Sequence, residues 1–170
     1  MKKLLLYLLI GTCLVSCRED EVVVPTEYEI IPEEVKPGQK IIGMYLLNEG
    51  NMGSNKSTLD YVDFSQGYYV RNLYAERNPH VIKELGDVGN DIQIYGSRIY
   101  AVINCSNKIE VLDARTAHRI GQVNIPNVRY VRFHKGYAYA TSYVGPVQLN
   151  NPDAVQGAVY KIDTLSLDRK

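Results

Sequence analysis

Apolar and polar residues alternate with a period of two from about residue 40 to the end of the sequence. Such alternation is typical of β-strands that bury one face, whereas a helix repeats its apolar positions every three to four residues. No window of useful length has the period of an amphipathic helix, so the sequence predicts an all-β fold. The expected strands cover 41–47, 58–64, 68–73, 91–95, 98–103, 108–112, 119–125, 137–142 and 159–163.

A repeated unit narrows the choice among all-β folds. Three alternating segments end in an aspartate, and these residues, Asp63, Asp113 and Asp163, are spaced by 50 positions. Another expected strand precedes each segment. Repeats of about this length are typical of β-propeller blades, each of which consists of four antiparallel strands. A β-sandwich built from similar strands is the alternative.

The expected strands make up about three blades. Residues 41–73 supply one blade that lacks a strand, 91–125 a complete blade, and 129–170 a third blade whose last strand is cut short at 167–170. A closed propeller needs at least four blades. We therefore expect residues 41–170 to be a partial β-propeller domain. Either the sequence is a fragment or a truncated reading frame, or the remaining blades come from elsewhere.

The N-terminus has the pattern of a bacterial lipoprotein signal peptide. Two lysines precede an apolar run over 4–10, and the stretch 14–17, Leu-Val-Ser-Cys, places a small residue before a cysteine. The apolar run is too short for a permanent membrane-spanning helix. We expect a signal peptidase to remove residues 1–16 and Cys17 to be acylated, which anchors the mature protein to a membrane.

Two alternatives to this leader remain open. One is an ordinary secretory signal peptide cleaved after Ser16, and the other is acylation of Cys13, whose preceding residues fit less well. If Cys13 leaves with the leader and Cys17 is acylated, Cys105 has no partner for an internal disulfide. We expect Cys105 to be a small, half-buried residue at the end of a strand.

Residues 17–40 are predicted to be an extended tether. The 23 positions from 18 to 40 hold three prolines and seven acidic residues, and such composition buries too little apolar surface to offset the entropy of ordering. The stretch 18–21, Arg-Glu-Asp-Glu, resembles the export tag of Bacteroidetes lipoproteins that are sent to the cell surface. A solvated charge cluster is the alternative. The expected location is the outer membrane, with the domain exposed on the cell surface.

Several stretches together resemble one known family; they are 46–51, 59–63, 89–92, 107–113 and 160–163. They resemble the seven-bladed propellers of the YncE-like, surface-layer type, and in particular Bacteroidetes surface lipoproteins of that group. The resemblance covers nearly all of residues 41–170. It implies a seven-bladed ring that binds a ligand without chemical turnover. The function it implies most closely is capture of corrinoids, vitamin B12 among them, for a TonB-dependent outer-membrane transporter.

A ligand site is expected where the loops between the second and third strands of the blades emerge on one face. These loops are 48–57, 104–107 and 143–157, and loops on a rigid scaffold commonly carry recognition. Their polar side chains can hydrogen-bond amides or hydroxyls, and a tyrosine can stack on a flat ring system. The candidate ligand-binding residues are Asn48, Glu49, Asn51, Asn104, Asn107 and Tyr143. For each asparagine, turn formation is the alternative.

Charge and motif content argue against several other classes. Removing the leader with its two lysines leaves 17 basic and 19 acidic side chains, so no basic field is available for nucleic acid. The three histidines are far apart in the sequence, and we expect no catalytic residues, no metal site and no cofactor. Two alternatives stay open: a glycan- or protein-binding adhesion propeller, and a fragment of a propeller enzyme such as a lactonase or lyase.

Overall fold

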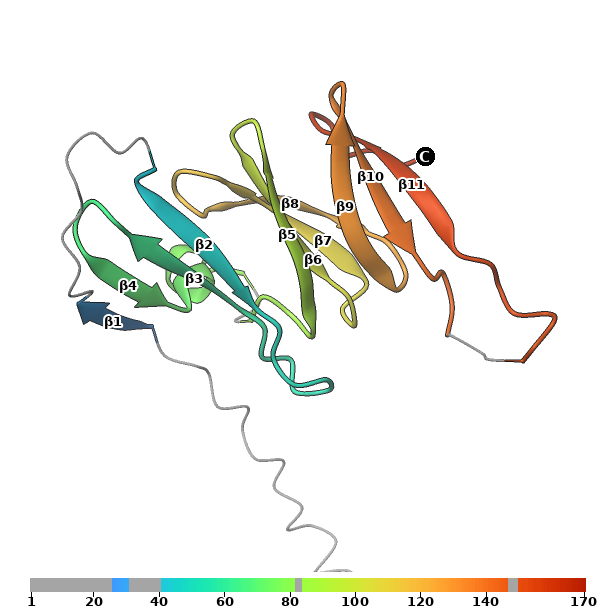
Figure 1. Ribbon diagram of the computed structural model, residues 1–170, viewed down its shortest axis with the longest axis horizontal. Helices are drawn as coiled ribbons and strands as arrows, with labels where there is room; N and C mark the ends of the chain where they lie inside the picture. The colour runs from blue at the N-terminus through green and yellow to red at the C-terminus, as the bar shows by residue number, and fades with distance from the viewer. Residues whose placement is uncertain (1–25, 31–40, 82–83, 147–149) are drawn as a thin grey trace, which may run out of the picture.

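The structure is a computed structural model that describes residues 26–30, 41–81, 84–146 and 150–170. Within these residues the chain forms three antiparallel sheets and one short helix, which confirms the all-β fold. The sheets lie side by side (Figure 1), and each corresponds to one of the expected blades. The expected signal peptide 1–16 and the expected acylation site Cys17 lie outside the described residues.

The three blades are named here in chain order. Blade 1 has the strand order β1-β4-β3-β2 and consists of β1 (Glu27–Ile30), β2 (Gly43–Asn48), β3 (Thr58–Asp63) and β4 (Tyr68–Arg71). Blade 2 has the order β5-β6-β7-β8 and consists of β5 (Gly89–Tyr95), β6 (Arg98–Ile103), β7 (Lys108–Asp113) and β8 (Arg119–Asn124). Blade 3 has the order β11-β10-β9 and consists of β9 (Val128–His134), β10 (Tyr137–Ser142) and β11 (Ala158–Asp163).

Blade 3 also confirms the expected start of a fourth strand. Ile162 forms an isolated antiparallel bridge with Arg169. The backbone N–H of Lys170 donates to the carbonyl of Lys161 at 2.8 Å, and the N–H of Lys161 donates to the carbonyl of Lys170 at 3.1 Å. The last residues therefore begin to pair with the free edge of β11, as the sequence predicted for 167–170.

The strand β1 corrects the predicted domain boundary. It pairs antiparallel with β4, with Glu27 opposite Arg71, and the two side chains form an ion pair at 2.7 Å. The expectation of a tether over 17–40 is therefore wrong for residues 27–30, and the β-domain includes a strand that precedes residue 41. The other predicted tether residues, 17–25 and 31–40, lie outside the described part of the chain.

Register shows which strands of the three blades are equivalent. The first residue of one strand pairs with the repeated aspartate of the next in every blade: Gly43 with Asp63, Arg98 with Asp113, and Tyr137 with Asp163. β2, β6 and β10 are therefore equivalent second strands, and β3, β7 and β11 are equivalent third strands. The sequence predicted that residues 41–73 lack one strand, and among the described residues the missing one is the equivalent of the first strands β5 and β9. Blade 1 still has four strands, because β1 pairs with β4 at the edge of the sheet opposite to β2.

Blade 2 is buried on both faces. Tyr100 and Val102 of β6 contribute to the core shared with blade 3, whereas Ile99, Ala101 and Ile103 of the same strand contribute to the core shared with blade 1. This explains why β6 reads as a continuous apolar run, since successive side chains point to opposite faces. A two-sheet sandwich buries only one face of each sheet, so the stacking of three sheets favours propeller blades over that alternative.

The repeated aspartates organise the turn that follows each third strand. The Oδ1 atom of Asp113 accepts hydrogen bonds from the N–H groups of Arg115 and Thr116, both at 2.9 Å. Asp163 accepts in the same way from Leu165 and Ser166, at 2.8 and 3.1 Å. These backbone bonds hold the pKa of both carboxyl groups below the usual range. The repeat seen in the sequence is therefore a turn motif rather than a ligand motif.

Asp63 makes the same turn in blade 1. Its Oδ1 atom accepts from the N–H of Ser65 at 2.8 Å, the hydroxyl of Ser65 at 2.6 Å and the N–H of Gln66 at 3.0 Å. Partial burial raises the pKa of this carboxyl group, but the three hydrogen bonds together lower the pKa by more than burial raises it. The pKa of Asp63 is therefore below its usual value.

The helix α2 (Leu73–Arg77) replaces the end of a predicted strand. We expected a strand over 68–73, but β4 ends at Arg71 because Asn72 takes the left-handed conformation, with φ of 49°. Leu73 and Tyr74, in the first turn of the helix, are buried. The side chain of Asn78 then donates to the carbonyl of Ala117 at 3.0 Å, which fastens the end of the helix to the β7–β8 turn of blade 2.

Candidate functional site

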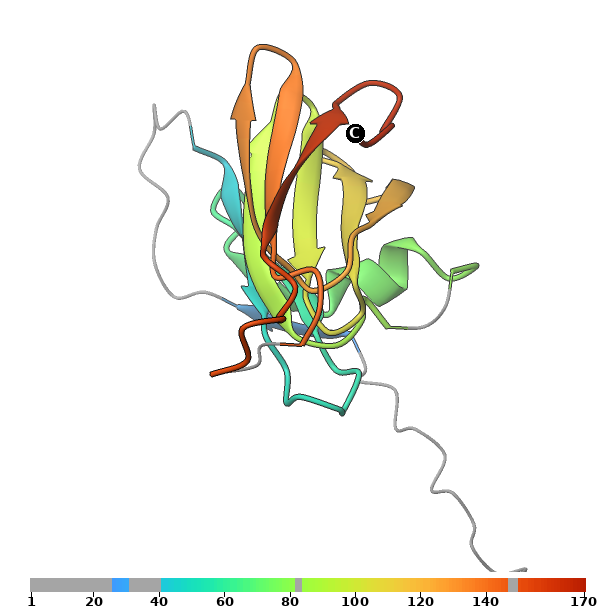
Figure 2. The ribbon, with the colours of Figure 1, turned by 90° about the vertical axis from the view of Figure 1, so that its right-hand side faces the viewer.

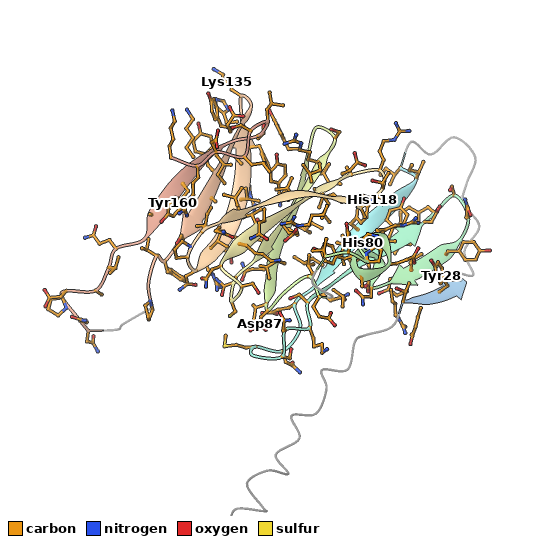
Figure 3. The ribbon with its side chains drawn as sticks, turned by 180° about the vertical axis from the view of Figure 1, so that it is seen from behind. Tyr28, His80, Asp87, His118, Lys135 and Tyr160 are labelled. Atoms are coloured by element: carbon orange, nitrogen blue, oxygen red, sulfur yellow. The ribbon has the colours of Figure 1, made fainter. Side chains whose placement is uncertain are left out.

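The three predicted recognition loops lie at one end of the sheets, the lower end in Figure 1. Asp87 marks this end in Figure 3, and Lys135, in the β9–β10 turn, marks the opposite end. The structure thus brings the loops after β2, β6 and β10 to a common end, which is named here the loop end. Residues 147–149 of the third loop lie outside the described residues.

In blade 1, Asn48 contributes to the fold. Its side-chain amide donates to the Thr58 hydroxyl at 2.8 Å and to the Asp60 carboxylate at 2.7 Å. Glu49 and Asn51 contribute to the fold through backbone hydrogen bonds. The Glu49 carbonyl, for example, accepts from the N–H of Gly89 at 3.0 Å. The side chains of Glu49 and Asn51 are exposed at the loop end.

In blade 2, the two predicted asparagines hold the β6–β7 turn against the β8–β9 connection. Asn104 is only 5% exposed, and its amide donates to the side chain of Asn127 at 2.9 Å and to the carbonyl of Val128 at 2.7 Å. Asn107 has φ of 55°, and its side-chain oxygen accepts from the N–H of Asn127 at 2.6 Å. The amides of both residues therefore serve turn and bridging roles.

Asn127 is a residue of the loop end that the sequence analysis missed. Besides its bonds to Asn104 and Asn107, its amide donates to the carbonyl of Gly145 at 3.0 Å, and its carbonyl accepts from the N–H of Tyr143 at 3.2 Å. It connects the loops of blades 2 and 3. The signal in the sequence was the Pro-Asn pair at 126–127, because asparagine tolerates the left-handed turn conformation that Asn127 adopts, with φ of 44°.

Tyr143 is the aromatic residue predicted for this end, and it is exposed. The guanidinium group of Arg129 lies 5.5 Å from the centroid of its ring, within the range of a cation–π contact. The Nε atom of Arg129 is buried and has no hydrogen-bond partner among the described residues. The arrangement places a cation behind an exposed aromatic ring.

Asp87 is a second missed residue, and it joins the loops of blades 1 and 2. Its carboxylate accepts from the N–H of Gly53 at 2.9 Å and from the N–H of Asn55 at 3.3 Å. Its own N–H donates to the hydroxyl of Ser106 at 2.8 Å. The neighbouring Cys105 is exposed rather than half-buried, which corrects the prediction. Residual burial and the charge of Asp87 raise the pKa of the Cys105 thiol, so its thiolate is disfavoured.

A pocket of about 450 Å³ lies away from the loop end, between the face of blade 1 and the β7–β8 turn of blade 2. Four tyrosines contribute to its lining, and we call it the tyrosine pocket; they are Tyr28, Tyr45, Tyr61 and Tyr68. Cationic and imidazole side chains also line it, namely Arg77, Arg115 and His118. Sequence analysis missed this pocket because its residues come from four distant segments, and tyrosine abundance alone reflects strand propensity.

The walls of the tyrosine pocket are held in place by packing. The rings of Tyr45 and Tyr61 lie 4.8 Å apart between centroids, and the Tyr45 hydroxyl donates to the carbonyl of Ala114 at 3.1 Å. A Cβ atom at Gly43 would lie 2.1 Å from the Tyr61 hydroxyl, so only glycine leaves room for this ring. Burial raises the pKa of Tyr45 to about 12 and also raises that of Tyr61, so both phenols are neutral hydrogen-bonding groups.

A buried charge cluster lies on the face of β7 that points to blade 1. Glu110 is fully buried, accepts from Lys108 Nζ at 2.7 Å, and forms an ion pair with Arg119. Burial raises the pKa of the adjacent Tyr74, and the Glu110 charge raises it further. Glu110 has two cationic partners and none of the three charged residues lines the tyrosine pocket, so we assign this cluster to the packing between the blades. Within the described ranges, no group of three or more His, Cys, Asp or Glu side chains is arranged to hold a metal ion.

Comparison with known proteins gives no family for this chain. No protein-family model matches the sequence, and no curated protein matches it. The resemblance to the YncE-like propellers therefore stays a prediction. In the part of the chain that the structure describes, no helix is long and apolar enough to cross a membrane.

Proposed function

We propose that this protein is a lipoprotein, anchored through Cys17 on the outer surface of the outer membrane, that binds a ligand without chemical turnover. In its sharpest form the proposal is that the loop end captures corrinoids, vitamin B12 among them, and passes them to a TonB-dependent transporter. The observation that carries it is that three loops from three blades meet at one end of a rigid β-scaffold.

The side chains left exposed at this end define what a ligand would contact. Asn104 is buried and bonded within the fold, whereas the other five predicted residues are exposed. Of these five, Asn48 and Asn107 already hydrogen-bond within the fold, which leaves Glu49, Asn51 and Tyr143 as the main candidates for ligand contact. A corrin is a broad ring fringed with amides, which suits an exposed tyrosine for stacking and polar side chains for hydrogen bonds. The expected contacts therefore come from fewer residues than the sequence suggested.

Titration calorimetry of the full chain with cyanocobalamin tests this form of the proposal. Asn51→Ala should weaken binding by about two- to thirteen-fold, the effect of one lost hydrogen bond of about 0.5–1.5 kcal/mol. Tyr143→Ala should weaken it through loss of stacking, whereas Tyr68→Ala, in the tyrosine pocket, should leave it unchanged. Absence of heat with any corrinoid at high micromolar concentration would rule out corrinoid capture.

The tyrosine pocket favours a second candidate, the binding of an acidic glycan. Its volume of about 450 Å³ falls in the range of small-molecule sites. Aromatic rings offer flat apolar surfaces for sugar rings, and a cation such as Arg115 can pair with a carboxylate or sulfate. Arg115 is exposed at the pocket and Arg77 also lines it, so two guanidinium groups outnumber the one carboxylate of the lining, Asp63.

A glycan array that contains acidic and neutral oligosaccharides tests the second candidate. Arg115→Ala should weaken binding of acidic glycans by about ten- to a hundred-fold, since a hydrogen bond to a charged group contributes about 1.5–3 kcal/mol. Tyr68→Ala should weaken the binding of acidic and neutral glycans alike. Tyr143→Ala, at the loop end, is the matched control and should leave glycan binding unchanged. Retention of acidic glycans by both pocket variants would exclude this site.

A further inference from the structure

The same kind of polar contact occurs at both blade interfaces within the chain. The hydroxyl of Tyr45, in blade 1, donates to the carbonyl of Ala114, in blade 2, at 3.1 Å. The hydroxyl of Tyr100, in blade 2, donates to the carbonyl of Thr164, in blade 3, at 3.3 Å. Each tyrosine is the third residue of a second strand, and each acceptor follows the repeated aspartate of the next blade. We name this contact the tyrosine latch.

The acceptor of the latch is held in the same way in every blade. The N–H groups of Ala114 and Thr164 donate to the residue just before the second strand of their own blade, at 2.8 and 3.1 Å. In blade 1, Phe64 follows the repeated aspartate, and its N–H donates to the carbonyl of Ile42, also just before a second strand, at 2.9 Å. The Phe64 carbonyl therefore occupies the position of a latch acceptor.

The donor of the latch also has a third copy. Tyr139 is the third residue of β10, as Tyr45 is of β2 and Tyr100 is of β6. It lies on the face of blade 3 that points away from blade 2, since Ala138 and Ala140 on either side of it enter the core shared with blade 2. No other described element covers that face, which is turned to the viewer in Figure 2.

By its position in the repeat, this face is equivalent to the faces that form the two interfaces within the chain. Val159 of β11 is 64% exposed, whereas the equivalent residues Leu59 and Ile109 are 0% exposed. At the opposite end of the stack, blade 1 also has a residue that is more exposed than its equivalents. Met44 of blade 1 is 46% exposed, whereas its equivalents Ile99 and Ala138 are 0% exposed. The described chain therefore presents one uncovered donor face, on blade 3, and one uncovered acceptor face, on blade 1.

We propose that blade 3 of one copy of this chain docks on blade 1 of a second copy, in the head-to-tail manner of the blades within one chain. The hydroxyl of Tyr139 donates to the Phe64 carbonyl of the second copy, and Val159 packs against Met44 on the acceptor face. The continuity of this contact with the two interfaces inside the chain argues for a second copy as the occupant, because both faces belong to the same repeat.

The geometry of such a contact determines what assembles. A head-to-tail contact uses two different surfaces, so it produces closed rings or open chains rather than a two-fold dimer with a self-complementary patch. Because blade 1 has no described equivalent of β5, the docked surface is smaller than the interfaces within the chain. Association should therefore be reversible and should depend on protein concentration.

Sedimentation velocity of the full chain in non-ionic detergent, over a concentration series, tests the proposal. Val159→Asp blocks the donor face and Met44→Asp blocks the acceptor face, and both side chains are exposed enough for the variants to fold, as far-UV circular dichroism verifies. Each variant alone should be monomeric. An equimolar mixture should form a one-to-one complex and nothing larger, because each variant keeps one intact face.

Other outcomes contradict the proposal. A wild-type chain that stays monomeric at every concentration overturns it, and so does a mixture of the two variants that stays monomeric. Self-association of either variant alone shows a different interface. Tyr139→Phe should weaken association by about two- to thirteen-fold, as one lost hydrogen bond predicts. Tyr130→Phe, on the same face but outside the latch position, is the matched control and should have no effect.

Discussion

Asn127 offers the sharpest test of how the loop end is held together. Its side chain accepts from the Asn104 amide at 2.9 Å and donates to the Gly145 carbonyl at 3.0 Å, so it connects blades 2 and 3. Its backbone is left-handed, with φ of 44°. The change Asn127→Ala removes both side-chain bonds and places a residue with a poor left-handed preference at this position. We expect it to destabilise the protein and to loosen the loop end.

The expected magnitude follows from these two contributions. Two hydrogen bonds of about 0.5–1.5 kcal/mol each amount to about 1–3 kcal/mol. The left-handed conformation costs a residue with a Cβ atom roughly 1–2 kcal/mol, a penalty that glycine does not have. Asparagine and alanine both carry a Cβ atom, so Asn127→Ala should lower the free energy of unfolding by about 1–3 kcal/mol, mainly from the lost bonds. Asn127→Gly loses the same bonds but relieves the backbone penalty, so it should lower the free energy of unfolding by less, at most about 2 kcal/mol.

Urea unfolding followed by far-UV circular dichroism measures both variants, since the chain contains no tryptophan for fluorescence. The order of the two variants is the decisive result. If Asn127→Gly is as destabilised as Asn127→Ala, backbone strain at this position has no role. If neither variant differs from the wild type, the inter-blade hydrogen bonds contribute nothing, and the loop end is held by other contacts.

Three further predictions follow from the turns, the leader and β1. Because the folded-state pKa of Asp113 is depressed, its turn stabilises the fold above the unfolded-state pKa of about 4 and loses that contribution as pH falls through the folded-state pKa. The urea midpoint of the wild type should therefore fall in acid, and the midpoint of Asp113→Asn should fall by less. Cys17→Ala should release the protein from membranes, as fractionation measures, whereas external protease should digest the wild type on intact cells; protection from protease contradicts surface exposure. A chain that begins at residue 41 lacks β1 and leaves the edge of β4 unpaired, so it should melt at a lower temperature than one that includes β1, and equal melting temperatures would show that β1 does not stabilise the blade.

The sequence predicted the bounds of two inner strands best, each of which pairs with a neighbour on both edges. The expected bounds of β6 (Arg98–Ile103) and β10 (Tyr137–Ser142) match the structure. The 50-residue spacing of the repeated aspartates identified the blade, because each of these residues ends a third strand and builds the turn that follows. Local alternation and turn chemistry therefore sufficed to predict the repeat and the order of the strands.

What the sequence did not predict depends on contacts between distant segments. The strand β1 lies in an acidic, proline-containing stretch, and it becomes a strand because the free edge of β4 supplies its partners. The helix α2 has five residues, too few to show a helical period. The tyrosine pocket and the role of Asn127 arise only when blades lie against one another, so no local pattern marks them.

The loop end shows why a shared location of loops does not by itself identify the residues that contact a ligand. Asparagine is favoured there for two reasons, ligand hydrogen bonds and left-handed turns, and the sequence cannot separate them. In the structure the amides of Asn104 and Asn107 both bond to Asn127, so these residues fix the relative positions of the blades. If the loop end binds a ligand as proposed, the contacts should come mainly from the exposed side chains of Glu49, Asn51 and Tyr143, because the exposed Asn48 and Asn107 already hydrogen-bond within the fold.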